Sequence, residues 1–298
     1  MRECRHATST HEGQNSVLLA GLCTIDLVQR VTEIPAPGEK VQSLSVELAA
    51  GGPATNAAVA VAVLGGRPRL LTGIGRHPLA EVARADLASL GVSIVDLAEG
   101  AADPPAVSAV SVRDSDGERT VVAHNAAAAR LDVPQEMLAR ELAHASAVLL
   151  DGHHQELAIA VARAAGARGI PIVVDAGSWR PVFTDLLPLV DVCACSASFR
   201  TPDGRADGHL GPPVVTRTHG AGPVHWHAEG RSGEVDVPPV HARDTAGAGD
   251  VWHGALVNGI ATLGRVPGAT ELPDLIRAAN DLAARRIAHP GPRRWTRE

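Results

Sequence analysis

The chain has 298 residues, of which 45% are hydrophobic and 20% are charged, a composition typical of globular proteins and long enough for a large core. Its net charge is −6 at pH 7, so its overall field repels nucleic acids and anionic membranes. Aromatic residues make up only 2% of the chain, which argues against surfaces that stack nucleic-acid bases. We therefore expect neither a nucleic acid nor a membrane as a partner.

The N-terminal segment and the cysteines indicate the compartment. Residues 1–15 are polar and lack the apolar centre of a signal peptide, so we expect a disordered tail there. No apolar run approaches the 18 residues that span a bilayer. The cysteines are few and none forms a C-x-x-C pair, which is typical of a reducing cytoplasm. They are Cys4, Cys23, Cys193 and Cys195.

From residue 16 onward, short apolar segments alternate with helical ones. A strand running into a turn is predicted over 16–28, a helix over 51–66, a strand over 69–75 and a helix over 78–92. Strands follow over 145–152, 170–177, 189–196 and 211–218, with a helix over 155–169 and a hairpin over 222–238. This alternation predicts an α/β fold with a central, mostly parallel sheet flanked by helices. Nothing divides residues 16–298 into separate domains.

Two segments break the alternation. Residues 106–127 indicate two strands joined by a turn at Asp116 and Gly117, and residues 28–48 are extended. Neither segment fits a parallel sheet with crossover helices. We therefore place both in a small accessory sheet.

The stretch "DTAGAGD", residues 244–250, opens a helix with apolar spacing. Gly247 and Gly249 would each cost roughly 1 kcal/mol inside a helix, so they indicate a sharp turn or a close approach of the backbone to a ligand. The start of a helix with bare backbone favours anions. The motif therefore predicts an anion site with a carboxylate, Asp250, beside it; the alternative is a carboxylate that only stabilises the helix dipole.

This motif resembles the carboxy-terminal signature of the ribokinase (PfkB) family of carbohydrate kinases. "GGPATNAAVAVAVLG", from residue 51, is similar to the amino-terminal signature of that family, and the resemblance covers residues 16 to 292. It implies a ribokinase-like fold with a small β-sheet lid near 28–48 and 104–126. It also implies ATP-dependent phosphorylation of a sugar hydroxyl, on a ketose or pentose such as fructose or ribose.

The resemblance assigns the catalytic roles. Asp250 would be the general base that takes the proton of the attacking hydroxyl. The backbone N–H groups of Ala248, Gly249 and Asp250 would neutralise the transferring phosphate, and Gly247 and Gly249 would leave room for it.

On the sugar side, the resemblance implies hydrogen bonds from Asp26 and Asn56, with Gly51 and Gly52 letting the backbone approach. Arg119 on the lid would reach the substrate or a phosphate, and Asp151 would line the sugar pocket. Each of the four side chains has a plainer alternative role. Asp26 would be a turn residue and Asn56 a solvated helix residue. Arg119 would be an exposed hairpin arginine and Asp151 a strand-end cap.

On the nucleotide side, the resemblance implies roles for Thr216, Gly220, Asp244, Thr245 and Asn280. It implies ATP with Mg²⁺, and a K⁺ ion held by the loop at 289–291. The N-x-x-E motif that helps to organise Mg²⁺ in most of the family reads Ser196 and Phe199 here, so the protein groups that hold a metal stay unknown.

Two other functions remain open. A nucleoside kinase of the same fold would need an apolar or aromatic base pocket, and a sensor that binds sugar without turnover would fit the loss of the glutamate at Phe199. A zinc site is a weak alternative, because His153 and His154 are adjacent and diverge, and no carboxylate or cysteine neighbours His225 and His227. The resemblance also suggests a homodimer through the lid, although nothing in the sequence sets the oligomeric state.

Overall fold

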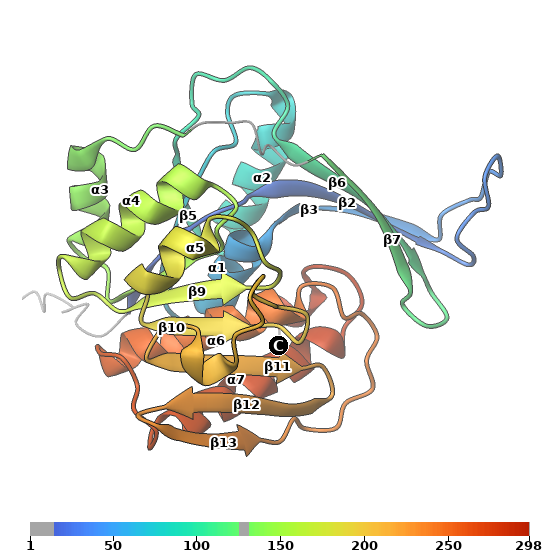
Figure 1. The fold of residues 1–298 in the computed structure, drawn as a ribbon. Helices are drawn as coiled ribbons and strands as arrows, with labels where there is room; N and C mark the ends of the chain where they lie inside the picture. The colour runs from blue at the N-terminus through green and yellow to red at the C-terminus, as the bar shows by residue number, and fades with distance from the viewer. Residues whose placement is uncertain (1–14, 125–130, 298) are drawn as a thin grey trace, which may run out of the picture.

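The computed structural model describes residues 15–124 and 131–297. The large sheet has nine strands in the order β13-β12-β11-β10-β9-β8-β1-β4-β5 (Figure 1). The strands from β11 to β5 run parallel, and β12 and β13 add antiparallel at one edge. They are β1 Ser16–Ala20, β4 Arg67–Thr72, β5 Ser93–Asp96, β8 Ala147–Leu150, β9 Ile172–Ala176, β10 Val192–Cys195, β11 Val214–His219, β12 Gly222–Ala228 and β13 Arg231–Val235.

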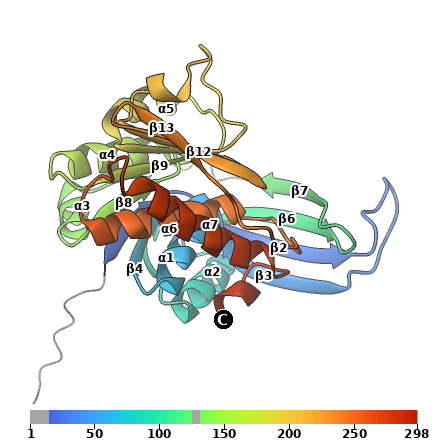
Figure 2. The same ribbon diagram turned by 90° about the horizontal axis from the view of Figure 1, so that it is seen from below.

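Helices cover both faces of this sheet, as Figures 1 and 2 show. Successive residues of β1 point to opposite layers, so Val17 and Leu19 pack in one core and Leu18 and Ala20 in the other. One layer holds α1 Pro53–Val63, α2 Pro78–Ser89, α6 Ala248–Leu263 and α7 Leu272–Ile287. The other holds α3 Gln135–Leu142, α4 Gln155–Gly166 and α5 Phe183–Leu186. The predicted α/β architecture is confirmed.

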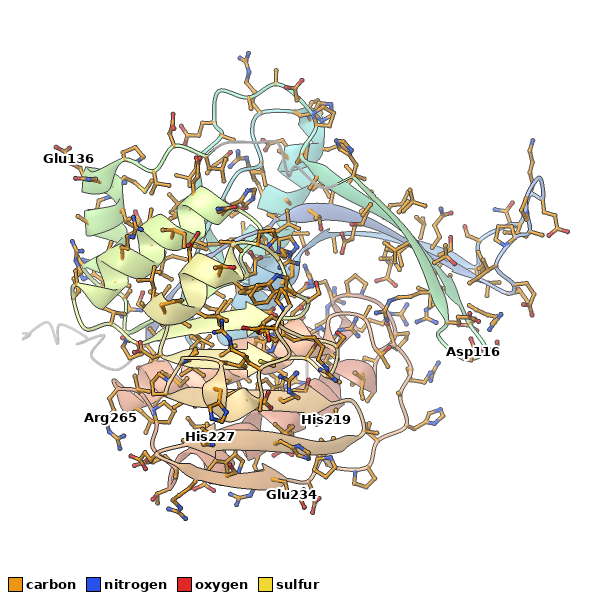
Figure 3. The ribbon with its side chains drawn as sticks, in the orientation of Figure 1. Asp116, Glu136, His219, His227, Glu234 and Arg265 are labelled. Atoms are coloured by element: carbon orange, nitrogen blue, oxygen red, sulfur yellow. The ribbon has the colours of Figure 1, made fainter. Side chains whose placement is uncertain are left out.

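A second sheet of four strands, in the order β3-β2-β6-β7, projects from the body (Figure 1). Its strands are β2 Thr24–Val31, β3 Ser45–Gly51, β6 Ala106–Arg113 and β7 Arg119–His124. Asp116 lies at the tip of the β6–β7 hairpin (Figure 3). This small sheet is the predicted lid, and both segments that broke the alternation contribute to it.

The segment 16–28, predicted as a strand running into a turn, contains the strand and the turn and then enters a second strand in the other sheet. The chain leaves the large sheet after Ala20 and enters the lid at Thr24. At Gly21, a Cβ atom would lie 2.2 Å from the Asp151 carboxylate, so the turn needs a glycine. The sequence pattern missed the second strand because the residues on both sides of the turn are apolar.

One helix was not predicted, and one predicted segment cannot be compared with the structure. Helix α3, Gln135–Leu142, has no counterpart among the predicted elements. The tail predicted over residues 1–15 falls almost entirely outside the described residues. No helix in the described part of the chain has the length and apolarity needed to cross a membrane.

Candidate active site

Helices α1 and α6 meet at the centre of the site. At Gly254, a Cβ atom would lie 2.4 Å from the carbonyl oxygen of Ala57, so this glycine lets the helices touch. The contact brings Asn56 to Asp250, and the Asn56 amide donates a hydrogen bond of 2.9 Å to the Asp250 carboxylate. Two residues predicted from separate motifs, 194 positions apart, therefore act on one another.

The start of α6 presents bare backbone, as predicted. Gly247 is the N-cap, with a left-handed φ of 68° that favours glycine. The N–H of Ala248 donates to the Thr245 carbonyl at 3.3 Å. Within the described residues, the N–H groups of Gly249 and Asp250 have no hydrogen-bond acceptor, and the space where Gly249 would carry a side chain is open. Those two amides are therefore available to an anion.

A second carboxylate and a histidine lie behind Asp250. Burial and the charge of Asp175 together raise the pKa of Asp250 to about 6, and the Asn56 hydrogen bond opposes the shift. His253, one turn along α6, lies 3.0 Å from Asp175, measured from Nδ1 to Oδ2, and both side chains are buried. Burial lowers the pKa of His253, but the Asp175 carboxylate outweighs it, so the pKa is raised overall. Asp175 and His253 therefore act on Asp250 in opposite directions: the Asp175 carboxylate raises the pKa of Asp250, and His253 lowers it.

The lid supplies Asp26 to the same site. The Thr24 hydroxyl donates to Asp26 at 2.6 Å, and burial raises the pKa of Asp26. At Gly51, a Cβ atom would lie 1.9 Å from the Asp26 carboxylate, which explains the glycine there. Gly52, with a φ of 99°, is the N-cap of α1. A cavity of about 80 Å³ between the lid and α6 is lined by Asp26, Asn56, Asp244 and Gly247 among others.

Two lid arginines touch the signature loop. Arg119 donates to the Thr245 hydroxyl at 3.2 Å, and Arg30 donates to the Arg243 carbonyl at 3.5 Å. Arg119 therefore contacts the loop that precedes α6, and its contact with the substrate or a phosphate stays a prediction. The lid lies closed against this loop.

Asp151 has an internal set of partners. It is 1% exposed, and its carboxylate accepts hydrogen bonds from the backbone N–H groups of Leu22, Ala54 and His153. Burial alone would raise its pKa, but the hydrogen bonds and the nearby His153 lower it to about 2. These contacts favour the strand-end cap over a direct sugar ligand.

The predicted nucleotide-side residues are spread over the C-terminal half. Thr216 and Asn280 are buried; the Asn280 amide accepts from the Trp252 indole at 2.8 Å and donates to the Asp236 carbonyl at 3.0 Å. Gly220 lies in the exposed turn between β11 and β12, with a φ of 64°. Thr216 and Asn280 therefore lie inside the protein and Gly220 at its surface, and the nucleotide-binding role of all three stays a prediction.

The position of the missing glutamate is filled by an aromatic cluster. Phe199 is fully buried against Phe183 and Trp179, with ring centroids 5.4 and 5.9 Å away. Ser196 donates to the Gly177 carbonyl at 2.5 Å. Among the residues that the structure describes, no group of three or more His, Cys, Asp or Glu side chains could hold a metal ion. These residues do not fit a protein-held Mg²⁺ at this place.

The K⁺ ion implied by the 289–291 loop is also a poor fit. Arg286 is 4% exposed, and its guanidinium donates to the carbonyl oxygens of His289 at 3.2 Å and Asp244 at 3.4 Å. It also lies 3.5 Å from the Asp244 carboxylate, which accepts the Gly291 N–H at 3.0 Å. The oxygens that would bind the ion are thus bound to a fixed cation of the protein.

The comparisons identify the family. A model of the pfkB family carbohydrate kinases matches residues 14–198 and 205–297, so the chain belongs to this family. An ATP-dependent ribose-1-phosphate kinase of Halopiger xanaduensis is 28% identical over 262 residues, covering 86% of this chain and 88% of the relative. The chain is an ATP-dependent sugar kinase.

Solved structures show the same fold. The structure of Arabidopsis thaliana ribokinase with ribose and ATP superposes with a TM-score of 0.75 at 20% identity, covering 94% of each chain. A Burkholderia thailandensis nucleoside kinase in complex with inosine gives a TM-score of 0.71 at 16% identity, covering 94% of this chain and 92% of that one. Both superpositions show the same overall fold.

Sequence reasoning missed several charged residues of the site. Asp175 lies one residue before the carboxyl end of the buried parallel strand β9, where open parallel sheets bind ligands, and could have been found by that position. His253 follows the signature motif, but no pattern in the sequence connects it with Asp175. Arg286 could not be found, because an arginine in the last turn of a helix normally indicates only a favourable interaction with the helix dipole.

Proposed function

We propose that this chain transfers the γ-phosphate of ATP to a hydroxyl of a ketose or pentose, such as fructose or ribose. Asp250 is the general base, and the backbone of residues 247–250 is the anion hole. The observation that carries this proposal is the juxtaposition at the start of α6: a carboxylate oriented by Asn56 stands beside two free backbone amides and open space.

The reaction follows from this geometry. The acceptor hydroxyl lies between Asp26 of the lid and Asp250, and loses its proton to Asp250 as its oxygen attacks the γ-phosphorus. The bond between that phosphorus and the bridging oxygen breaks, and ADP leaves. The amides of Gly249 and Asp250 stabilise the charge that builds on the transferring group. Mg²⁺, carried by the ATP phosphates and water, supplies further neutralisation. The cytoplasm supplies ATP and suits the three cysteines that the structure describes, which are all free.

A substrate screen tests the proposal. ADP release is measured with Mg-ATP and sugars, sugar phosphates and nucleosides as acceptors. Sugar-dependent turnover supports the proposal; turnover of nucleosides alone favours the nucleoside kinase. Sugar binding without any turnover favours the sensor, the alternative that the buried Phe199 keeps open.

We expect the activity to be independent of K⁺, because Arg286 occupies the oxygens that would bind it. Replacing K⁺ by Na⁺ should change kcat/KM less than about two-fold. In Arg286→Met, which keeps the length but removes the charge, K⁺ should raise both the melting temperature and the activity relative to Na⁺. Wild-type activity that rises at least ten-fold with K⁺ would contradict this assignment.

The lid also suggests how two chains pair. On its outer face, β3 exposes Val46 and Leu48, which are 60% and 53% exposed, and β7 exposes Val122, which is 72% exposed. Strand register aligns Leu48, Leu27, Ala109 and Val122 across the sheet. The opposite face lines the site through Asp26 and Val28 among others. An apolar sheet face of this kind is typical of an interface.

We expect a homodimer that forms through this outer face. Leu48→Glu combined with Val122→Glu should shift the mass measured by light scattering from dimer to monomer, because like charges would meet in an apolar contact. Leu64→Glu, at a surface leucine 43% exposed and outside the lid, is the matched control and should stay dimeric. A wild-type chain that is monomeric at tens of micromolar would refute the lid interface.

A further inference from the structure

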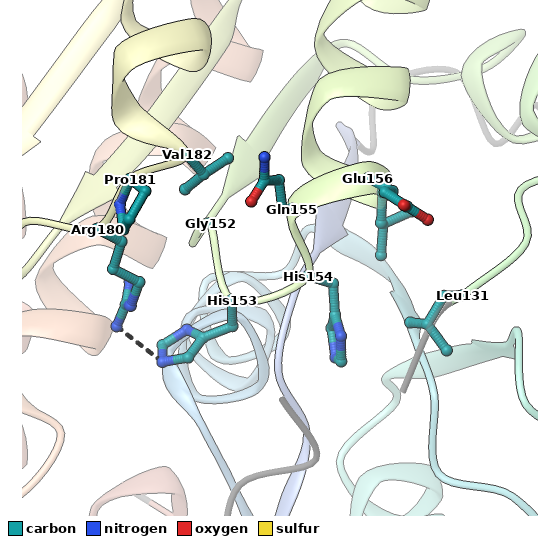
Figure 4. Close-up of a pocket in the computed structure, with 10 residues that line it drawn as sticks. Leu131, Gly152, His153, His154, Gln155, Glu156, Arg180, Pro181 and Val182 are labelled. Carbon is teal, nitrogen blue, oxygen red and sulfur yellow. Dashed lines mark hydrogen bonds between the residues drawn. The ribbon is translucent and has the colours of Figure 1, made fainter. Parts of the chain in front are cut away.

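A second cavity, of about 400 Å³, lies at the carboxyl end of β8. Figure 4 shows that the loop after β8, the start of α4 and the segment around Arg180 enclose it. Its lining includes Gly152, His153, His154, Gln155, Glu156 and Arg180. The proposed phosphate transfer at Asp250 uses none of these side chains.

Arg180 is held in place by neutral groups. Its guanidinium donates to the carbonyl oxygen of Asp151 at 2.9 Å and lies 2.8 Å from Nε2 of His153 (Figure 4). Since a guanidinium can only donate, Nε2 accepts, and the proton of His153 resides on Nδ1, which lies 3.4 Å from the Asp151 carboxylate. Within the described residues, no carboxylate lies within 4.0 Å of the Arg180 guanidinium. Its remaining N–H groups are thus available to an anion.

The start of α4 adds donors to the same cavity. The helix is 12 residues long, and its N-cap residue, His154, makes no side-chain hydrogen bond to the first turn. The amides of Gln155 and Leu157 donate to no acceptor among the described residues, whereas that of Ala158 is bonded to the His154 carbonyl. The dipole of α4 therefore favours an anion here.

His154 points to a ligand independently of the helix. It is 7% exposed and lines the cavity, and its Nε2 has no partner among the described residues. Burial lowers its pKa, so the ring is neutral and can donate from one nitrogen. A buried polar atom without a partner carries a cost that a bound ligand removes. Two carboxylates oppose an anion here. That of Glu156 is exposed at the rim, and that of Asp151 lies behind His153, where three backbone N–H groups already donate to it.

Asp151 links this cavity to the acceptor site. One of its carboxylate oxygens accepts the N–H groups of Leu22 at 2.8 Å and Ala54 at 3.2 Å, and the other accepts the N–H of His153 at 2.9 Å. Ala54 lies in the first turn of α1, two residues before Asn56. A single buried side chain therefore joins the start of the helix that positions Asp250 to the loop that holds Arg180.

We propose that this cavity binds an anionic group of the acceptor, a phosphate or carboxylate carried by the sugar away from the hydroxyl that Asp250 activates. The inference rests on the proposed sugar kinase function and specifies its substrate class. The planar guanidinium of Arg180 matches two oxygens of either group, and the α4 amides and His154 supply further donors. The preferred acceptor is then a sugar phosphate or a sugar acid rather than the neutral sugar.

Paired acceptors test this inference. Ribose and fructose are compared with ribose 1-phosphate, fructose 1-phosphate and the sugar acid ribonate, with Arg180→Met, Arg180→Lys and the wild type. We expect kcat/KM for an anionic acceptor to exceed that for its neutral parent by at least about 100-fold. Arg180→Met should remove most of this preference by raising KM, with a much smaller effect on the neutral sugar, and Arg180→Lys should retain part of it. Arg168→Met, at an exposed arginine just after α4, is the control.

The phosphate and carboxylate arms identify which group the cavity takes. Wild-type preference for neutral sugars, or an equal loss on both acceptor types in Arg180→Met, overturns the inference and leaves the kinase proposal standing. Calorimetry with inorganic phosphate gives a readout that is independent of turnover. If no acceptor is turned over while phosphate still binds and Arg180→Met abolishes that binding, the proposed function fails and the anion site stands.

Discussion

Asp250→Asn is expected to lower kcat by at least about 100-fold while the affinity for the sugar changes only a few-fold. A general base contributes about that much to a proton transfer, and the amide keeps the shape of the carboxylate but cannot accept the proton. Asn56 can still donate to an oxygen at this position, so the acceptor pocket keeps its form. Steady-state kinetics with calorimetric binding of the sugar separate the two effects.

The same variant is expected to be more stable than the wild type at pH 8. Burial raises the pKa of Asp250 to about 6, so its ionised form is disfavoured in the folded protein relative to the unfolded chain. This destabilisation is present above pH 6 and disappears as the pH falls below the ordinary carboxyl pKa of about 4. The melting temperature of Asp250→Asn should exceed that of the wild type by several degrees at pH 8 and approach it near pH 4.

The pH dependence of activity gives the control. Because the base must be ionised, wild-type kcat/KM should fall about ten-fold per pH unit below about 6. Near-wild-type turnover by Asp250→Asn would remove Asp250 from the role of general base. A variant that loses activity and also melts at a lower temperature at pH 8 would indicate a structural role instead.

Gly249→Leu is expected to abolish phosphate transfer without weakening the fold. The backbone at Gly249 is helical, and a side chain there meets open space rather than protein atoms. Leucine is the better helix former by roughly 0.8 kcal/mol, so the melting temperature should not fall. Because this open space is where the transferring phosphate is proposed to bind, kcat/KM for ATP should fall by at least about 100-fold.

Gly249→Ala is the matched control, since its single methyl group reaches a much smaller part of the same space. We expect an intermediate loss of activity and an unchanged melting temperature. A leucine variant with wild-type kinetics would show that the phosphate lies elsewhere. Binding of ADP, which lacks the terminal phosphate, should be affected less than binding of an ATP analogue.

Much of the fold was predictable from the sequence because its signals are local. Buried parallel strands are short apolar runs, and the glycines of the two signatures stand where backbone must turn or approach closely. Gly51, Gly52 and Gly247 each have a neighbour or a φ that a side chain would not tolerate. The lid was predictable because its two segments are rich in strands but lack the crossover helices of a parallel sheet.

The parts of the candidate site that the sequence did not predict depend on contacts between segments far apart in the chain. Asn56 and Asp250 were each assigned to the site, but their hydrogen bond follows from the packing of α1 on α6 through Gly254, which no local pattern contains. The same holds for Arg286, which lies 42 residues from the Asp244 it contacts. Arg180 and His153 have no motif at all, and only the cavity that they share draws attention to them.

A crystal structure with a non-hydrolysable ATP analogue and a sugar acceptor would test the start of α6 most directly. We expect the terminal phosphate to accept hydrogen bonds of about 2.7–3.2 Å from the N–H groups of Gly249 and Asp250, with the acceptor hydroxyl facing the Asp250 carboxylate. A terminal phosphate bound away from these amides, with Asp250 facing no acceptor hydroxyl, would contradict the proposed mechanism.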